Sequence, residues 1–252
     1  MGERDGYGFD LLAFGPHPDD VELGMGGTIA LHAARGHRVA ICDLTAGEFG
    51  TGGDRRTRAR EAEEAARILG VGLRVNLGLP DRGLVYGAGG RGAGGEQVRR
   101  AVEVIRRLRP RVVALPWGDD RHPDHVAAHH LLREAVFTAA LAKYETAEPP
   151  HRPQQMVFYF LNDAPEPSFL VDISVFWQKK SESLFAYRSQ FERTPGGPET
   201  PLNAPHGLLY RIESRDRYYG SLIGVGYAEG FRLRQPPVLD GLPGLHGPSG
   251  QG

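Results

Sequence analysis

Short apolar runs alternate with amphipathic stretches along the first 145 residues of the chain. The runs are typical of buried strands, and the amphipathic stretches place apolar residues at helical spacing. Predicted strands span residues 10–15, 38–44, 73–77 and 111–115. Predicted helices span residues 26–35, 56–69, 97–108 and 124–144. Strands separated by helices indicate right-handed crossovers and a mostly parallel sheet covered on both faces. We therefore predict an α/β fold, a Rossmann-like three-layer sandwich.

The pattern is less regular after residue 145. The elements predicted there are strands at 155–161 and 169–173, a helix through Phe191 that Ser174 caps, a Pro/Gly loop at 194–205 and a short helix at 212–220. No internal repeat or linker interrupts the chain, so we expect one domain over residues 1–240. A Gly/Pro-rich tail over residues 241–252 is expected to be disordered.

Composition and charge exclude several classes of protein. With 30 basic and 31 acidic residues, the chain has no global field that would favour nucleic acid. Its single cysteine, Cys42, excludes an intrachain disulfide framework and fits a reducing compartment. No apolar run approaches the roughly 18 residues of a membrane span, and the polar first residues do not resemble a secretory signal. We therefore expect a cytoplasmic protein with neither a membrane nor a nucleic-acid partner.

Histidines and carboxylates gather at two places, each directly after a predicted strand. The sequence HPDDVE follows the first strand at residues 17–22, and HPDH follows the fourth at residues 122–125. In a doubly wound sheet of order 3-2-1-4 these strands are neighbours, and the crevice opens at their carboxyl ends. Each proline also disfavours a helical conformation for the histidine before it. The two motifs are therefore expected to face each other across one cleft.

The residue types in this cleft fit a catalytic metal site. His17, Asp20 and His125 are suitable ligands for one zinc ion per chain, with the fourth position left for water. Asp19 then remains beside the metal as a general base, because zinc lowers the pKa of its water towards ~7. His122 is expected to stabilise the transition state, and Asp124 to orient His122.

Other interpretations of these motifs are weaker. Each motif alone also fits a capped helix start, but both at neighbouring strand ends favour a shared site. His125 and His129 form H-x-x-x-H without the glutamate of H-E-x-x-H, so Asp20 is the preferred third ligand. The glycines at 24–27 do not match a dinucleotide fingerprint, and we expect them to allow close packing. No G-x-S-x-G elbow supports serine hydrolysis.

Five stretches carry a family resemblance: FGPHPDDVELGMGGTIA, DLTAGEFGTGG, TRAREAEEAARILG, NLGLPDR and DRHPDH. Together they resemble the LmbE/PIG-L-like family of zinc-dependent N-deacetylases. Later stretches, among them VDIS, AYRSQFERT and VGYAEGFRL, make the chain most similar to the bacillithiol-biosynthesis deacetylases of that family. The resemblance extends over residues 9–240, although the glycine run at 87–95 departs from it.

The resemblance implies the same site roles: zinc on His17, Asp20 and His125, Asp19 as base, and His122 with Asp124 at the oxyanion. It also implies that Arg58 reaches the sugar or its acidic aglycone, and it assigns no late tyrosine a catalytic role.

The implied reaction is hydrolysis of the N-acetyl group of an N-acetylglucosaminyl conjugate. N-acetyl-α-D-glucosaminyl L-malate is the expected substrate. The alternatives are a mycothiol-type precursor, chitin oligomers, or a non-catalytic sugar- or metal-binding module. An unligated Asp19 argues against the module, since binding alone needs no base. Fe²⁺ or Co²⁺ would also suit the ligands, and the resemblance implies a homo-oligomer, a trimer or a hexamer.

Overall fold

The computed structural model describes residues 7–86, 92–192, 200 and 202–237, and its centre is a seven-stranded sheet of order β3-β2-β1-β4-β5-β7-β6. Its strands are β1 (Phe9–Gly15), β2 (Val39–Thr45), β3 (Leu73–Leu79), β4 (Pro110–Pro116), β5 (Gln155–Tyr159), β6 (Phe169–Asp172) and β7 (Ala228–Arg232). Strands β1 to β5 pair in parallel, and β7 runs antiparallel to both β5 and β6. The predicted mostly parallel sheet, with β1 beside β4, is confirmed.

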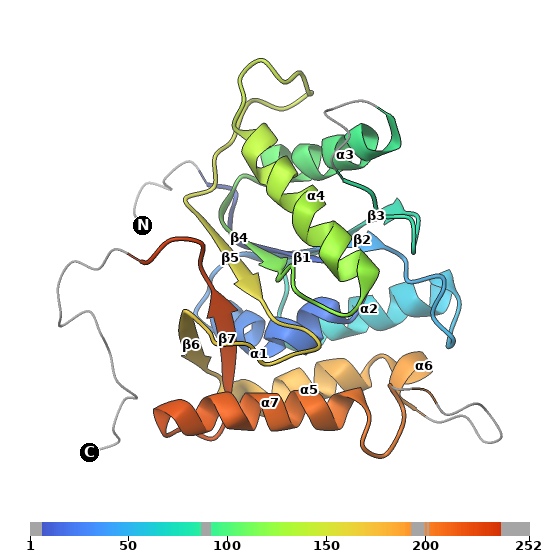
Figure 1. The fold of residues 1–252 in the computed structure, drawn as a ribbon, viewed down its shortest axis with the longest axis vertical. Helices are drawn as coiled ribbons and strands as arrows, with labels where there is room; N and C mark the ends of the chain where they lie inside the picture. Colours follow the sequence, from blue (N-terminus) through green and yellow to red (C-terminus); the bar gives the residue numbers. More distant parts are fainter. Residues whose placement is uncertain (1–6, 87–91, 193–199, 201, 238–252) are drawn as a thin grey trace.

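Helices cover both faces of this sheet. They are α1 (Asp20–Ala34), α2 (Arg55–Leu69), α3 (Gly92–Leu108), α4 (Pro123–Ala139), the 3-10 helix η1 (Ser174–Phe176), α5 (Trp177–Phe185), α6 (Arg188–Phe191) and α7 (Leu208–Ile223). Figure 1 shows α3 and α4 on one face and α1, α2 and α5 on the other. The predicted three-layer α/β architecture is therefore confirmed.

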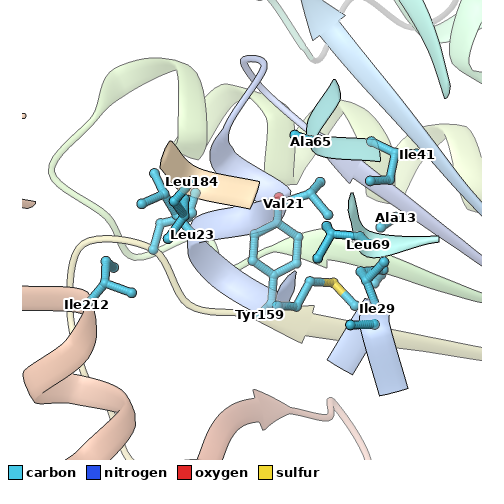
Figure 2. Close-up of a cluster of buried hydrophobic side chains, with 14 of the residues drawn as sticks. Ala13, Val21, Leu23, Ile29, Ile41, Ala65, Leu69, Tyr159, Leu184 and Ile212 are labelled. Carbon is cyan, nitrogen blue, oxygen red and sulfur yellow. The ribbon is translucent and has the colours of Figure 1, made fainter. Parts of the chain in front are cut away.

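Successive side chains of the central strands point to opposite faces of the sheet, and each face has one hydrophobic cluster. In β1, Leu11 and Ala13 join the cluster beneath α1 and α2, whereas Leu12 and Phe14 join the cluster beneath α3 and α4. Figure 2 shows the first cluster, in which the ring of Tyr159 lies among aliphatic side chains of α1. These two apolar layers hold the carboxyl ends of β1 and β4 in place.

The glycines of α1 make close packing on this face possible. A Cβ atom at Gly24 would lie 2.1 Å from the Tyr159 ring, and one at Gly27 would lie 2.7 Å from Ile173. The Tyr159 hydroxyl donates a hydrogen bond to the Phe14 carbonyl, 2.7 Å away. The glycines therefore serve contacts between α1 and the segments at and beyond β5.

Helix α1 is kinked, and a buried carboxylate caps its second half. Met25 has non-helical angles (φ −150°, ψ 24°). The freed backbone N–H groups of Gly27 and Thr28 donate to the Glu229 carboxylate at 3.0 and 2.7 Å. The same carboxylate accepts from Lys180 Nζ at 2.7 Å.

Lys180 belongs to α5, and it extends this contact from Glu229 to α7. Its Nζ also donates to Asp216 at 2.6 Å, and Lys180, Asp216 and Glu229 are all 0% exposed. Buried charges of this kind persist only when they are paired. The network therefore joins α1, α5, α7 and β7.

Six expectations about helices and strands were wrong in detail. The first helix begins at Asp20 instead of residue 26, because the HPDD loop is shorter than expected, and α4 ends at Ala139. Ser174 is no N-cap, because its hydroxyl donates to Asp172 and it stands within η1; the helix expected through Phe191 is divided into η1, α5 and α6. Helix α7 is longer than the predicted 212–220, and β7 was not predicted.

Some sequence expectations lie outside the described residues. These are the disorder of the tail at 241–252, most of the loop at 194–205 and the first part of the glycine run at 87–95. Within the described part of the chain, no helix is long and apolar enough to cross a membrane.

Candidate metal centre

The two histidine–aspartate motifs meet at the carboxyl ends of the paired strands β1 and β4. The ring centroid of His17 lies 4.9 Å from that of His122 and 5.7 Å from that of His125. His122 is the N-cap of α4, so the proline after it begins the helix and keeps the histidine in the crevice. The expectation that the two motifs lie close together is confirmed.

The three predicted metal ligands lie together. Asp20 Oδ2 is 3.0 Å from His17 Nδ1, and Asp20 Oδ1 is 3.4 Å from His125 Nε2. All three residues are buried. The Asp20 carboxylate thus stands between two imidazoles, each of which presents a nitrogen to it.

Two further combinations of side chains bring possible ligand atoms within 4.8 Å of one another. One is His17 with His122 and His125, and the other is His17 with Asp81 and Asp124. In His122, Nδ1 accepts a hydrogen bond from the Asp124 backbone N–H at 3.2 Å, which leaves Nε2 as the other possible ligand atom. His122 is therefore the main competitor of Asp20 for the third ligand position.

Asp81 and Asp120 belong to this centre, although the sequence reasoning assigned neither of them a role. Asp81 Oδ1 lies 3.3 Å from His17 Nε2, and Asp120 Oδ1 lies 3.0 Å from His125 Nδ1. Each aspartate comes shortly after a parallel strand, β3 for Asp81 and β4 for Asp120. That position at the carboxyl edge of the sheet was the available signal.

Asp124 occupies the centre, but with a different partner from the one expected. Its Oδ2 lies 3.2 Å from His17 Nε2 and accepts from the Arg82 backbone N–H at 2.8 Å. The hydrogen bond between Asp124 and His122 is made by the Asp124 backbone N–H. The carboxylate therefore orients His17, and the expected orientation of His122 comes from the first turn of α4. A catalytic role for Asp124 stays a prediction.

The charge of the cluster suits a cation. Burial lowers the pKa of His17, but the carboxylates of Asp124 and Asp20 outweigh burial and raise that pKa. Burial also lowers the pKa of His125, and there Asp20 and Asp120 outweigh it and raise the pKa to about 9. Both imidazoles are thus placed where positive charge is favoured. A nitrogen and oxygen donor set of this kind fits Zn²⁺, Fe²⁺ or Co²⁺.

Asp19 is set apart from this donor set. It has a left-handed backbone (φ 107°), which few residues other than glycine adopt, and its carboxylate lies against Arg58. The residue is 6% exposed. Burial raises the pKa of Asp19 to about 7, with Arg58 opposing that rise and the charge of Asp20 adding to it. Such a carboxyl can both take up and release a proton near neutral pH.

Arg58 lies beneath Asp19 instead of at the surface. Its Nη2 donates to the Pro18 carbonyl and lies 3.5 Å from Asp19 Oδ2, and the residue is 4% exposed. Two glycines of the loop after β2 enclose the guanidinium: a Cβ at Gly47 would be 2.9 Å from Arg58 Cζ, and one at Gly50 would be 3.0 Å from Nη1. Arg58 therefore holds the loop of Asp19, and its contact with a sugar stays a prediction.

Comparison with known proteins connects this centre to a family. A family model described as PIG-L, GlcNAc-PI de-N-acetylase, matches residues 12–136. The diacetylchitobiose deacetylase of Thermococcus kodakarensis is 33% identical, over 94% of this chain and 87% of its own length. The chain belongs to the PIG-L family. The matched residues include every predicted metal ligand and Asp19.

A second relative matches about half of the chain in sequence, and a solved structure matches its fold. The 1D-myo-inositol 2-acetamido-2-deoxy-α-D-glucopyranoside deacetylase of Mycobacterium leprae is 35% identical over 52% of this chain and 51% of its own length. The crystal structure of the conserved protein TT1542 from Thermus thermophilus superimposes with a TM-score of 0.80 and 42% identity. That match covers 92% of this chain and 97% of TT1542.

Proposed function

We propose that the chain is a metal-dependent hydrolase that removes the N-acetyl group from an N-acetylglucosaminyl conjugate. The observation that carries this proposal is the placement of Asp19, a buried carboxyl that lies against Arg58 beside, but outside, the predicted ligand set. A module that only binds metal or sugar needs no such base. Relatives named as deacetylases of acetamido sugars support the proposal.

The contacts among the predicted ligands support one metal position. His17, Asp20 and His125 would hold one divalent ion, which when bound supplies Lewis-acid polarisation of the acetyl carbonyl and acidifies a water. Asp81 and Asp124 contact Nε2 of His17, and Asp120 contacts Nδ1 of His125. These carboxylates would orient the two imidazoles towards the metal.

Asp19 carries the proton through the reaction. Its carboxylate takes one proton from the attacking water as the water oxygen forms a bond to the acetyl carbon. The C–N bond then breaks, and the carboxyl of Asp19 returns that proton to the leaving amine. The products are acetate and the free amino sugar. Arg58 keeps Asp19 oriented through both steps.

His122 is the proposed stabiliser of the negative oxygen of the tetrahedral intermediate. Its Nδ1 accepts the Asp124 N–H, so in the neutral ring the hydrogen is on Nε2. Burial and the charges of His125 and His17 lower the pKa of His122, which favours that neutral ring. A neutral N–H donor aimed at the oxyanion is an effective stabiliser.

The proposal is tested by acetate release from metal-loaded protein over a panel of N-acetylglucosaminides. The panel contains the malate conjugate predicted from the sequence, diacetylchitobiose, the myo-inositol conjugate and N-acetylglucosamine. Release from at least one member, lost on chelation and restored by Zn²⁺, is the expected result. Metal-loaded protein that releases no acetate from any member would establish the binding module instead. The cytoplasmic location and the trimeric or hexameric assembly stay predictions.

The two glycines that enclose the Arg58 guanidinium, Gly47 and Gly50, lead to a separate prediction. Gly47→Ala introduces a Cβ against the guanidinium at a backbone with φ +65°. The left-handed backbone costs about 1 kcal/mol of stability. Displacing Arg58 is expected to lower kcat/KM for acetate release at least about tenfold, because Asp19 loses its orientation.

Gly36→Ala is the matched control, since Gly36 has φ +79° and its Cβ would meet no atom within 4 Å. It should lose similar stability in chemical denaturation and retain full activity. Equal losses of activity in the two variants would show that the enclosure of Arg58 is not needed.

A further inference from the structure

A cavity of about 370 Å³ opens between the segment after β5 and helix α7. Its walls are residues 161–164 and the part of α7 from Tyr210 to Tyr218. Because β5 is parallel to β4 and beside it, the segment after β5 emerges at the same edge of the sheet as the metal centre. These residues lie beyond the PIG-L match, which ends at residue 136.

One side chain connects the cavity to the metal centre. Asn162 lines the cavity, and its Nδ2 donates to Asp120 Oδ1 at 2.8 Å. The same oxygen lies 3.0 Å from Nδ1 of His125, a predicted metal ligand. Asn162, Asp120 and His125 therefore form one chain of contacts from the cavity to the predicted metal position.

Two tyrosine rings line the cavity. Tyr210 is 56% exposed and Tyr218 is 53% exposed, although both belong to a helix whose other face is buried. Small-molecule sites are concave and lined by aromatic side chains together with a few polar groups. The polar groups here include the amide of Asn162 and the hydroxyl of Ser214. Rings with neighbouring hydrogen-bonding groups suit the apolar faces and hydroxyl edges of a sugar.

The charges of the cavity are compensated. Arg211 lies 3.9 Å from Asp163 and donates to the Asn162 carbonyl at 2.6 Å. Arg215 pairs with Asp216 and donates to the carbonyls of two residues after β5. Because each arginine has an acidic partner, the cavity does not offer an uncompensated cation to a carboxylate ligand such as malate. A neutral ligand fits it better than an anion.

We propose that this cavity is a subsite for a neutral sugar ring joined to the N-acetylglucosamine unit that is deacetylated. The substrate class is then an N-acetylated oligosaccharide, in place of the malate conjugate predicted from the sequence. This inference rests on the proposed function, since it takes the metal centre as the site of deacetylation.

The test compares diacetylchitobiose with N-acetylglucosamine in Tyr210→Ala and Tyr218→Ala. Loss of a stacking ring is expected to lower the ratio of kcat/KM for the disaccharide to that for the monosaccharide about tenfold, mainly through KM. Tyr210→Trp should restore the ratio. Phe137→Ala, which removes a 68% exposed ring from α4 outside the cavity, should leave it unchanged.

Two kinetic results would overturn the subsite. One is an unchanged ratio in both tyrosine variants. The other is a malate conjugate that is preferred over the disaccharide and loses turnover in the same variants. If no sugar releases acetate, the proposed function fails instead. Calorimetry of diacetylchitobiose binding to metal-loaded wild type and Tyr210→Ala then decides the subsite: weaker binding by the variant supports it, and equal or absent binding in both removes it.

Discussion

Asp19→Asn is expected to lower kcat for acetate release about 10³-fold while the protein keeps one metal ion per chain. Asparagine preserves the size of the side chain and tolerates the left-handed backbone at this position, but it cannot accept the proton of the attacking water. Asp19 also lies outside the predicted ligand set. The measurement is kcat on the most active substrate of the panel, with metal content determined on the same sample.

Asp20→Ala and His122→Ala complete this experiment. Asp20→Ala should lose the metal, because its carboxylate stands between His17 and His125. His122→Ala should retain the metal and lose rate about 10²-fold, as expected for a lost oxyanion donor. Metal lost with Asp19→Asn but retained with Asp20→Ala would reverse the roles of the two aspartates. Metal lost only with His122→Ala would show that the three imidazoles hold the ion.

The second large effect is expected far from the metal, at Lys180. Lys180→Met removes the cation that contacts Asp216 at 2.6 Å and Glu229 at 2.7 Å, and all three residues are 0% exposed. Two buried carboxylates then lose a shared partner. Removing one member of a buried ion pair costs about 3–5 kcal/mol. Urea denaturation should therefore show a much lower free energy of unfolding.

Lys179→Met is the control, because Lys179 is the neighbouring residue on α5 and its side chain is exposed. It should change the free energy of unfolding by less than about 0.5 kcal/mol. Adding Asp216→Asn to Lys180→Met should recover part of the loss, since it removes the charge of the oxygen that faced Lys180 while the other oxygen still accepts from Arg215. Equal stability of the two single lysine variants would mean that water or local rearrangement solvates the carboxylates.

The first half of the fold and the core of the site were predictable from the sequence. Strands and helices alternate there with clear periodicity, and the order 3-2-1-4 places residue 17 beside residue 125. Asp81 and Asp120 were not found, because Asp81 stands in a stretch without a histidine and Asp120, although it begins DRHPDH, precedes the HPDH residues to which roles were assigned. Their membership of the centre depends on loops that turn inward, shown by the contact of Asp81 with His17.

The second half was predicted less well, because long-range contacts decide it. The apolar pattern of β7 is interrupted by Glu229 and Gly230, which is typical of a loop. Glu229 is nevertheless buried, since it caps α1 and pairs with Lys180. The extent of α5 was also missed, because the chain turns at Tyr187, whose hydroxyl donates to Glu22 of α1. Partners so distant in sequence leave no local signal.

The position of β7 has a consequence for how the chain is made. It is the last strand of the described chain, yet it lies between β5 and β6. Until β7 is synthesised, β6 has no neighbour in the sheet, and Lys180 and the kinked α1 have no Glu229. The segment through the start of α4 contains the metal ligands and most of one apolar layer, so it can begin to fold during synthesis. Completion of the sheet waits for the synthesis of β7, and premature termination before β7 would leave an open strand edge prone to aggregation.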